Sequence, residues 1–426
     1  MPSLQSPQSP RRTALAGLIG NTLEWFDFAV YGYFASDIGK QFFPQASDTA
    51  QLLLAFAVFA LGFLARPIGG LMLGAVGDRV GRRALMMLSI TMMGGATLAI
   101  GLLPNYATIG IAAPILLLIL RLIQGFSLGG EFTGSMVYTT ELARASQRGL
   151  ISSSAAAGVT LGFILGSGAA WLVKSSMPPE DVAAWGWRIP FIASVLLLGI
   201  GWLLRRGLQE TEQGVIAAAA RPPLLKSLAA DWQPMLRAFG VIAMTNAAYY
   251  LMFTYVVERR SKSPGISAEH GADFLLANTL SLFVVLFAKP LGGWLSDLVG
   301  RRRLMLILTL TGMALILPGL WLALYGEPWQ FFIGQVLLAL PLGMSLGLQG
   351  ALLVEIFPLR TRVTSMSFAY GITLAVTGGT APLVAAWLVE TTHQPLAPAF
   401  YIMLYGLAAL ILIWPMPETN RRTLVT

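Results

Sequence analysis

The feature that most constrains this chain is a succession of long apolar runs that carry almost no charge. A helix needs about 20 mostly apolar residues to cross a bilayer, and twelve such runs fit into the 426 residues with short polar segments between them. Only 11% of the residues are charged, against roughly a quarter in a soluble protein. We therefore expect an all-α integral membrane protein with twelve transmembrane helices. The expected helices cover 14–36, 50–76, 84–103, 111–140, 150–173, 189–205, 236–257, 272–295, 304–325, 329–354, 363–389 and 397–416.

The polar segments divide the chain and orient it in the membrane. The longest, 206–235, separates a six-helix bundle at 14–205 from a second at 236–416, and cytoplasmic tails are expected at 1–13 and 417–426. This arrangement places nineteen of the 28 Lys and Arg residues on the cytoplasmic side and six on the periplasmic side, as the positive-inside rule requires. The net charge of +8 therefore reflects orientation in a bacterial-type cytoplasmic (inner) membrane, and no nucleic-acid partner is expected.

Short charged motifs occur twice, about half the chain apart. Gly-x-x-x-Asp-x-x-Gly-Arg-Arg lies at 74–83 and again at 293–302, and a Glu followed seven residues later by Arg lies at 141–148 and at 355–362. The repeats indicate two homologous, pseudo-symmetric halves. A topology signal alone would explain the arginines but not the fixed glycine and aspartate spacings. We expect a cytoplasmic gate made of Asp78, Arg79, Arg82, Glu141, Arg148, Asp297, Arg301, Glu355 and Arg362.

The first half carries charges inside its apolar runs. At 100° per residue, the polar positions of the first run fall on one helix face, and the fourth run has a similar stripe. Arg66 precedes Pro67 in the second run. A charge at the centre of a span costs roughly 2.5–3.5 kcal/mol and needs a partner or a function. Proton coupling is expected from Glu24, Asp27 and Glu131 with Arg121, and substrate contacts from Asn21, Tyr31, Arg121, Gln124 and Tyr138. The alternative is an ion-pair network that only holds helices together.

The runs of the second half are nearly free of charge, apart from Lys289, which we place near a cytoplasmic end. Neutral hydrogen-bonding groups and aromatic rings suit a small polar solute, and tyrosine faces attract quaternary ammonium groups. The alternative is that the tyrosines are packing or membrane-interface residues. The expected substrate-binding residues of this half are Asn246, Tyr249, Tyr250, Gln349 and Tyr370.

The composition also argues against an enzyme. The chain has no cysteine, which excludes disulfides and thiolate metal sites. Its two histidines, His270 and His393, fall in polar connections, so we expect no imidazole within a span and no metal site. No cofactor is expected other than protons as the coupling ion.

The paired motifs and Arg121-x-x-Gln124-Gly125 resemble the major facilitator superfamily. More narrowly, four stretches resemble its metabolite:proton symporters, which carry proline and betaine, citrate and tricarballylate, α-ketoglutarate or shikimate. These stretches are residues 20–28, 66–70, 129–131 and 185–190, and residues 246–250 and 385–390 look most like the proline/betaine branch.

The resemblance implies the major facilitator fold and a monomeric symporter that imports a small carboxylate-bearing solute with H⁺ by alternating access. An osmolyte such as proline or glycine betaine and an organic acid such as citrate both remain open, because the guanidinium of Arg121 suits carboxylates. The coiled-coil extension of osmosensing members is not expected after Thr426. The alternative is a proton-driven exporter of drugs or metabolites, which shares the fold.

Overall fold

The structure, a computed structural model, describes residues 10–80, 82–129, 131–206, 228–261, 268–359 and 361–420. Within these ranges the chain is helical and has no strands. Helical segments occupy each of the twelve expected ranges, although some ranges are divided and the segments begin and end a few residues away from the expected positions. The apolar runs therefore predicted where the helices lie. The structure differs from the prediction mainly in the places where a helix is interrupted.

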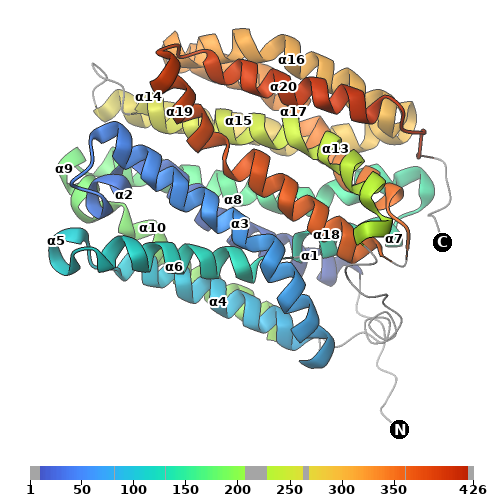
Figure 1. Cartoon of the computed structure of the whole chain (residues 1–426), viewed down its shortest axis with the longest axis horizontal. Helices are drawn as coiled ribbons and strands as arrows, with labels where there is room; N and C mark the ends of the chain where they lie inside the picture. Colours follow the sequence, from blue (N-terminus) through green and yellow to red (C-terminus); the bar gives the residue numbers. More distant parts are fainter. Residues whose placement is uncertain are drawn as a thin grey trace.

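The first half consists of long helices that run along the molecule, and its shortest helices gather at the left end of Figure 1. The interruption at Leu128 and Gly129 divides the range 111–140, expected as one helix, into α6 and α7. The helices of this half are α1 (Pro10–Tyr33), α2 (Ala35–Phe42), α3 (Asp48–Val80), α4 (Arg82–Leu102), α5 (Tyr106–Ile109), α6 (Ala112–Ser127), α7 (Glu131–Leu142), α8 (Arg148–Ser176), α9 (Pro179–Asp181) and α10 (Arg188–Arg206).

The second half contains two wide π-helical turns, Leu251–Tyr255 between α13 and α14 and Leu374–Gly379 between α18 and α19. Such turns interrupt the regular hydrogen bonding of a helix and often lie at functional sites. The helices of this half are α13 (Trp232–Tyr250), α14 (Val256–Ser261), α15 (Ala268–Val299), α16 (Arg301–Tyr325), α17 (Pro328–Ile356), α18 (Arg362–Thr373), α19 (Ala381–Thr392) and α20 (Ala397–Ile413).

Eight helical segments of the described residues are long and apolar enough to cross a membrane, and a ninth is counted if the bent pair Pro179–Gly186 and Arg188–Leu203 is one span. Two further apolar helices, Met87–Leu102 and Ala397–Ile413, are shorter. Length and composition therefore identify a multi-span helical protein without establishing all twelve expected spans.

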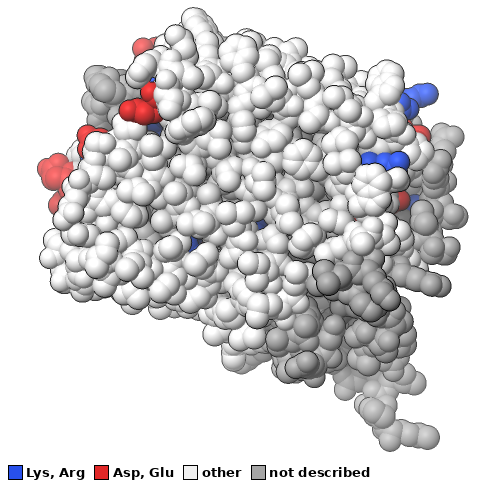
Figure 2. Space-filling model, viewed as in Figure 1, with Lys and Arg blue, Asp and Glu red and all other residues white. Residues whose placement is uncertain are grey.

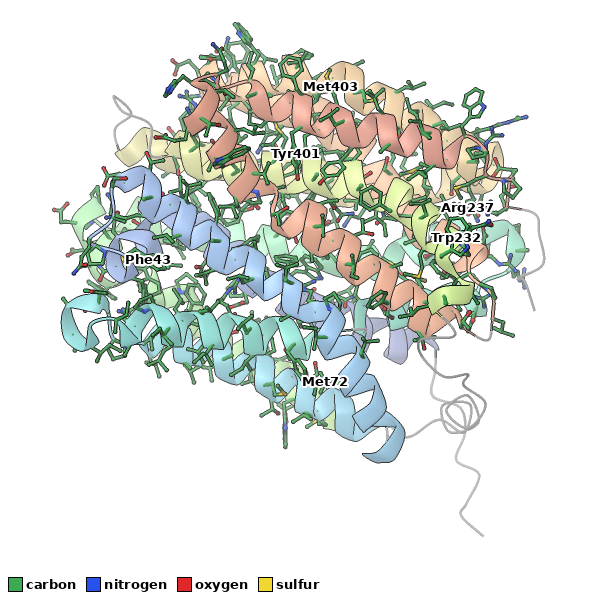
Figure 3. All side chains as sticks on the ribbon, in the orientation of Figure 1. Phe43, Met72, Trp232, Arg237, Tyr401 and Met403 are labelled. Atoms are coloured by element: carbon green, nitrogen blue, oxygen red, sulfur yellow. The ribbon has the colours of Figure 1, made fainter. Side chains whose placement is uncertain are left out.

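The surface has the pattern of a membrane protein. On the face shown in Figure 2, acidic and basic side chains gather at the two ends, and the belt between them is almost free of charge. Exposed tryptophans lie towards both ends of the molecule. Figure 3 shows one of them, Trp232, beside Arg237 at one end, and Phe43 marks the other end. Tryptophan is enriched at membrane–water interfaces. We call the end where α1 begins and α20 ends the terminal end, and the other the opposite end.

Small residues let α8 approach α1 closely. A Cβ atom at Gly162 would lie 2.6 Å from the carbonyl oxygen of Thr22, and one at Gly158 would lie 2.6 Å from the carbonyl oxygen of Leu18. Small residues repeated every fourth position allow such backbone contact in membrane helices. This packing holds the polar face of α1 against the interior of the protein.

Candidate functional site

The first element of the site is a buried ion pair between α1 and α6. Arg121 Nη1 lies 2.8 Å from Asp27 Oδ2, and the two residues are 0% and 1% exposed. Arg121 also donates a hydrogen bond to Gln124 Oε1 at 2.8 Å, and Gln124 Nε2 donates to Thr97 Oγ1 on α4 at 2.9 Å. The polar face of the first span therefore meets the polar stripe of the fourth at Asp27 and Arg121.

A second buried cation, Arg66, lies close by on α3. Its guanidinium is 4.7 Å from the ring centroid of Trp25, 4.5 Å from that of Phe28 and 4.4 Å from that of Phe63. It also interacts electrostatically with Glu24, which is itself buried. Cation–π contacts of this kind gain strength when they are desolvated. The first half thus buries two guanidinium groups, each beside a carboxylate.

A cavity lies between the two halves. Its volume of about 20 Å³ is room for one water molecule. Five of the expected substrate-binding residues line it, all from the second half. The lining consists of Trp25, Phe132, Met136, Ala156, Val159, Asn246, Tyr249, Tyr250, Lys289, Leu346, Gln349 and Tyr370.

The expected substrate-binding residues of the first half do not line this cavity. Arg121 and Gln124 belong to the ion-pair network, the Tyr31 hydroxyl donates to the carbonyl of Ala55 at 3.1 Å, and Asn21 Nδ2 donates to the carbonyl of Ala155 at 3.1 Å. The side chain of Tyr138, expected to bind substrate, and that of Glu131, expected to couple protons, lie outside the described residues.

Lys289 is a cavity residue that the sequence interpretation placed wrongly. We expected it near a cytoplasmic end, but it lines the central cavity and its residue is 1% exposed. A signal was present in the sequence: Lys289-Pro290-x-Gly-Gly repeats Arg66-Pro67-x-Gly-Gly of the first half. The two halves thus place a buried cation before the corresponding proline of α3 and of α15.

Charged contacts join the halves at the terminal end. Asp297 Oδ1 and Oδ2 accept hydrogen bonds from the backbone N–H groups of Gly149 and Leu150, both at 3.0 Å, at the start of α8. Asp297 also pairs with Arg301 at 2.8 Å. A carboxylate at a helix N-terminus is stabilised by the unpaired N–H groups and the helix dipole.

Two further ion pairs cross between the halves at this end. Arg362 Nη1 lies 2.7 Å from Glu141 Oε1, and Arg148 Nη1 lies 3.9 Å from Glu355 Oε1. The repeated Glu and Arg residues therefore pair across the halves. Arg301 contacts Glu355 as well, at 3.3 Å. The side chains of Asp78, Arg79 and Arg82, expected in the same gate, lie outside the described residues.

A comparable set of contacts at the opposite end was not anticipated. The Glu258 carboxylate accepts a hydrogen bond from the Ser36 N–H at 3.0 Å and pairs with Lys174 at 3.4 Å. Asn278 Nδ2 donates to the Tyr33 hydroxyl at 3.0 Å. These residues carried no repeated motif, and their charges looked like those of ordinary loops. Polar contacts between the halves therefore lie on both sides of the central cavity.

Comparison with known proteins agrees with this arrangement. The family described as "Sugar (and other) transporter" matches residues 13–213, and the one described as "Major Facilitator Superfamily" matches residues 261–425. A proline/betaine transporter of Salmonella typhimurium is 36% identical over 97% of this chain and 85% of its own length. A citrate-proton symporter of Klebsiella pneumoniae is 35% identical over 92% of this chain and 88% of its own length.

Solved structures share the fold at lower identity. The xylose transporter XylE from E. coli, in a partially occluded inward-open conformation, superposes with a TM-score of 0.74 at 20% identity, covering 97% of this chain and 99% of that one. Two helical halves around a central cavity, with family matches in each half, lead to one conclusion. The chain belongs to the major facilitator superfamily, in the group that includes proline/betaine transporters and citrate-proton symporters.

Proposed function

We propose that this protein is a proton-coupled symporter that imports a small carboxylate-bearing metabolite by alternating access. It has twelve spans in two six-helix bundles, 14–205 and 236–416, and works as a monomer in the bacterial cytoplasmic membrane with both termini in the cytoplasm. Protons serve as its only coupling ion, and it has no other cofactor. The family and the multi-span helical structure support this proposal.

The observation that carries the proposal is the position of the cavity between two sets of contacts that join the halves. Asp297 at the terminal end and Glu258 at the opposite end each accept a backbone hydrogen bond from the other half. Alternating access requires that one end open while the other stays closed around a fixed site. Contacts made of hydrogen bonds and ion pairs suit this task because water replaces them when an end opens.

Coupling is assigned to the buried ion pair of the first half. When Asp27 takes up a proton, its attraction to Arg121 falls, and the guanidinium is left to find another partner in a site closed to water. An unpaired charge in such a site is costly, so protonation and rearrangement are linked. Glu24, beside Arg66, and Glu131 are further candidates for the coupled carboxylate.

The solute is assigned to the cavity. Trp25, Tyr249, Tyr250 and Tyr370 present aromatic rings there, and Lys289 presents an ammonium group. Relatives named as proline/betaine transporters and citrate-proton symporters make an osmolyte or an organic acid the substrate class to test first. Because the cavity has room for only about one water molecule in this conformation, solute entry requires the halves to separate.

The test is uptake by the purified protein in liposomes under an inward proton gradient. Labelled glycine betaine, proline, citrate and α-ketoglutarate are offered separately, and accumulation of one of them that a protonophore abolishes is the expected result. In the variant Asp27→Asn proton-driven accumulation is lost, whereas Asp181→Asn, at an exposed carboxylate, transports normally. Net extrusion of the solute would instead support a proton-driven exporter, and full accumulation by Asp27→Asn would refute the assigned coupling residue.

A further inference from the structure

Lys289 differs from the other buried cations of the protein. Arg121 pairs with Asp27, and Arg66 interacts with Glu24. Lys289 Nζ instead donates a hydrogen bond to the backbone carbonyl of Ala156 at 2.6 Å. No carboxylate oxygen of the described residues lies within 4.0 Å of this nitrogen, the distance limit of an ion pair. A backbone carbonyl carries only a partial charge, so the ammonium group lacks full compensation.

The same cavity offers rings to a positive charge. Tyr249 and Tyr250 have ring centroids 5.9 Å apart at an interplanar angle of 78°, whereas the Trp25 ring already contacts the guanidinium of Arg66. Aromatic faces arranged around a space bind quaternary ammonium groups. The ammonium group and the aromatic rings that line this one cavity complement a solute that carries both a carboxylate and an ammonium group.

The repeat of the two halves gives Lys289 a functional position. Arg66 and Lys289 each precede the proline inside a long helix, α3 and α15, and the two glycines that follow. In the first half this cation is held by aromatic rings and a carboxylate of the protein itself. In the second half the corresponding cation faces the cavity, where a carboxylate can arrive from outside.

We propose that the ammonium group of Lys289 binds the carboxylate of the transported solute, and that the aromatic rings of the cavity receive its cationic end. The substrate class is therefore a small zwitterion, such as a betaine or an imino acid. This inference rests on the proposed transport function. It takes the role of carboxylate anchor away from Arg121, which is already engaged by Asp27 and Gln124. Solute binding replaces the hydrogen bond from Lys289 to Ala156.

The experiment compares glycine betaine with choline, which has the same quaternary ammonium but no carboxylate. Dissociation constants are measured by titration calorimetry on the purified protein and on Lys289→Met. The wild type should bind glycine betaine more tightly than choline. Lys289→Met should lose roughly 30-fold or more in affinity for glycine betaine, because one partner of a buried charge pair is removed. Its affinity for choline should stay the same. Lys289→Arg should retain most of the preference, and Lys40→Met, at an exposed lysine, all of it.

Two results of the binding experiment would overturn the inference. One is a Lys289→Met protein that binds glycine betaine within threefold of the wild type, and the other is a wild type that binds choline as tightly as glycine betaine. The second comparison needs no variant and so stands even if Lys289→Met does not fold. A wild type that accumulates citrate but no zwitterion would overturn this inference and leave the transport function intact. A wild type that accumulates no solute would defeat the proposed function itself.

Discussion

The contact between Asp297 and the start of α8 offers a direct test of the gate at the terminal end. Asp297→Asn keeps the size of the side chain but removes the negative charge of the carboxylate, which accepts hydrogen bonds from the N–H groups of Gly149 and Leu150. A hydrogen bond to a charged group contributes about 1.5–3 kcal/mol. Asp297 accepts two such bonds from the other half, and we count one as lost, because the Oδ1 atom of asparagine can still accept the other. The pair with Arg301 lies within the second half and persists when the end opens. The loss shifts the equilibrium towards the open terminal end by about 10- to 150-fold.

The chain lacks cysteine, so one engineered thiol can report this shift. Met136 lines the cavity from α7 and is 1% exposed. In the Met136→Cys protein, the rate of maleimide labelling should rise at least tenfold when Asp297→Asn is added. Adding Glu258→Gln, which weakens the contacts at the opposite end, should not raise labelling from the terminal side.

The exposed carboxylate of Asp48 provides the control, because it lies at the start of α3 and makes none of the ion pairs between the halves described above. A labelling rate for Asp297→Asn within threefold of the Asp48→Asn rate would refute the assignment. Equal increases from the terminal side with Asp297→Asn and Glu258→Gln would show general loosening of the protein, and would refute the idea of two separate gates.

Three further predictions concern stability and binding. Arg121→Met leaves the carboxylate of Asp27 buried without its partner, so it should destabilise the protein by about 3–5 kcal/mol, and adding Asp27→Asn should recover much of the loss in thermal unfolding. Gly162→Val places a side chain against the Thr22 carbonyl of α1, so it should lower the melting temperature by several degrees, whereas Gly168→Ala, which meets open space, should not. Tyr250→Phe should bind glycine betaine nearly as the wild type does, while Tyr250→Ala should lose about 0.5–2 kcal/mol of a ring contact, measured by calorimetry.

Much of the helical framework could be predicted from the sequence, because hydrocarbon thickness and backbone hydrogen bonding leave few choices for an apolar run of about 20 residues. The approach of the acidic face of the first span to Arg121 of the fourth also followed, since buried charges of opposite sign need each other, but the choice of Asp27 over Glu24 did not. The break between α6 and α7 did not follow. Leu128 and Gly129 lie in an apolar stretch whose hydropathy is the same whether or not the helix continues.

The depth of a residue was harder to predict than its helix. The run expected at 272–295 placed Lys289 near an end, but α15 continues to Val299, and Lys289 lies ten residues, or about 15 Å, before that point. The roles of Lys174 and Glu258 were missed for a related reason. The hydropathy pattern predicts that a charge lies near the end of a span. The rotation and tilt of the helices that carry Lys174 and Glu258 decide whether the charge contacts the other half of the protein.

The interface between α8 and α15 connects the separate observations. Along α15, Asn278, Lys289 and Asp297 make polar contacts with α8 at successive depths: Asn278 with Ser167, Lys289 with the carbonyl of Ala156, and Asp297 with the N–H groups of Gly149 and Leu150. The helices run antiparallel, because numbers rise along α15 as they fall along α8. Nineteen residues separate the outer two contacts, about 28 Å of helix and close to the thickness of the hydrocarbon core.

One interface therefore carries a contact at the terminal end, a contact at the opposite end and the proposed solute anchor between them. A rigid α15 cannot move away from α8 at both ends without also breaking the central contact, but a tilt about the centre opens one end and closes the other. A carboxylate that takes Lys289 from the Ala156 carbonyl removes the central contact and so eases this tilt. Solute binding would then lower the barrier to rocking through the residue that recognises the solute, which accounts for a lysine in an apolar stretch of α15.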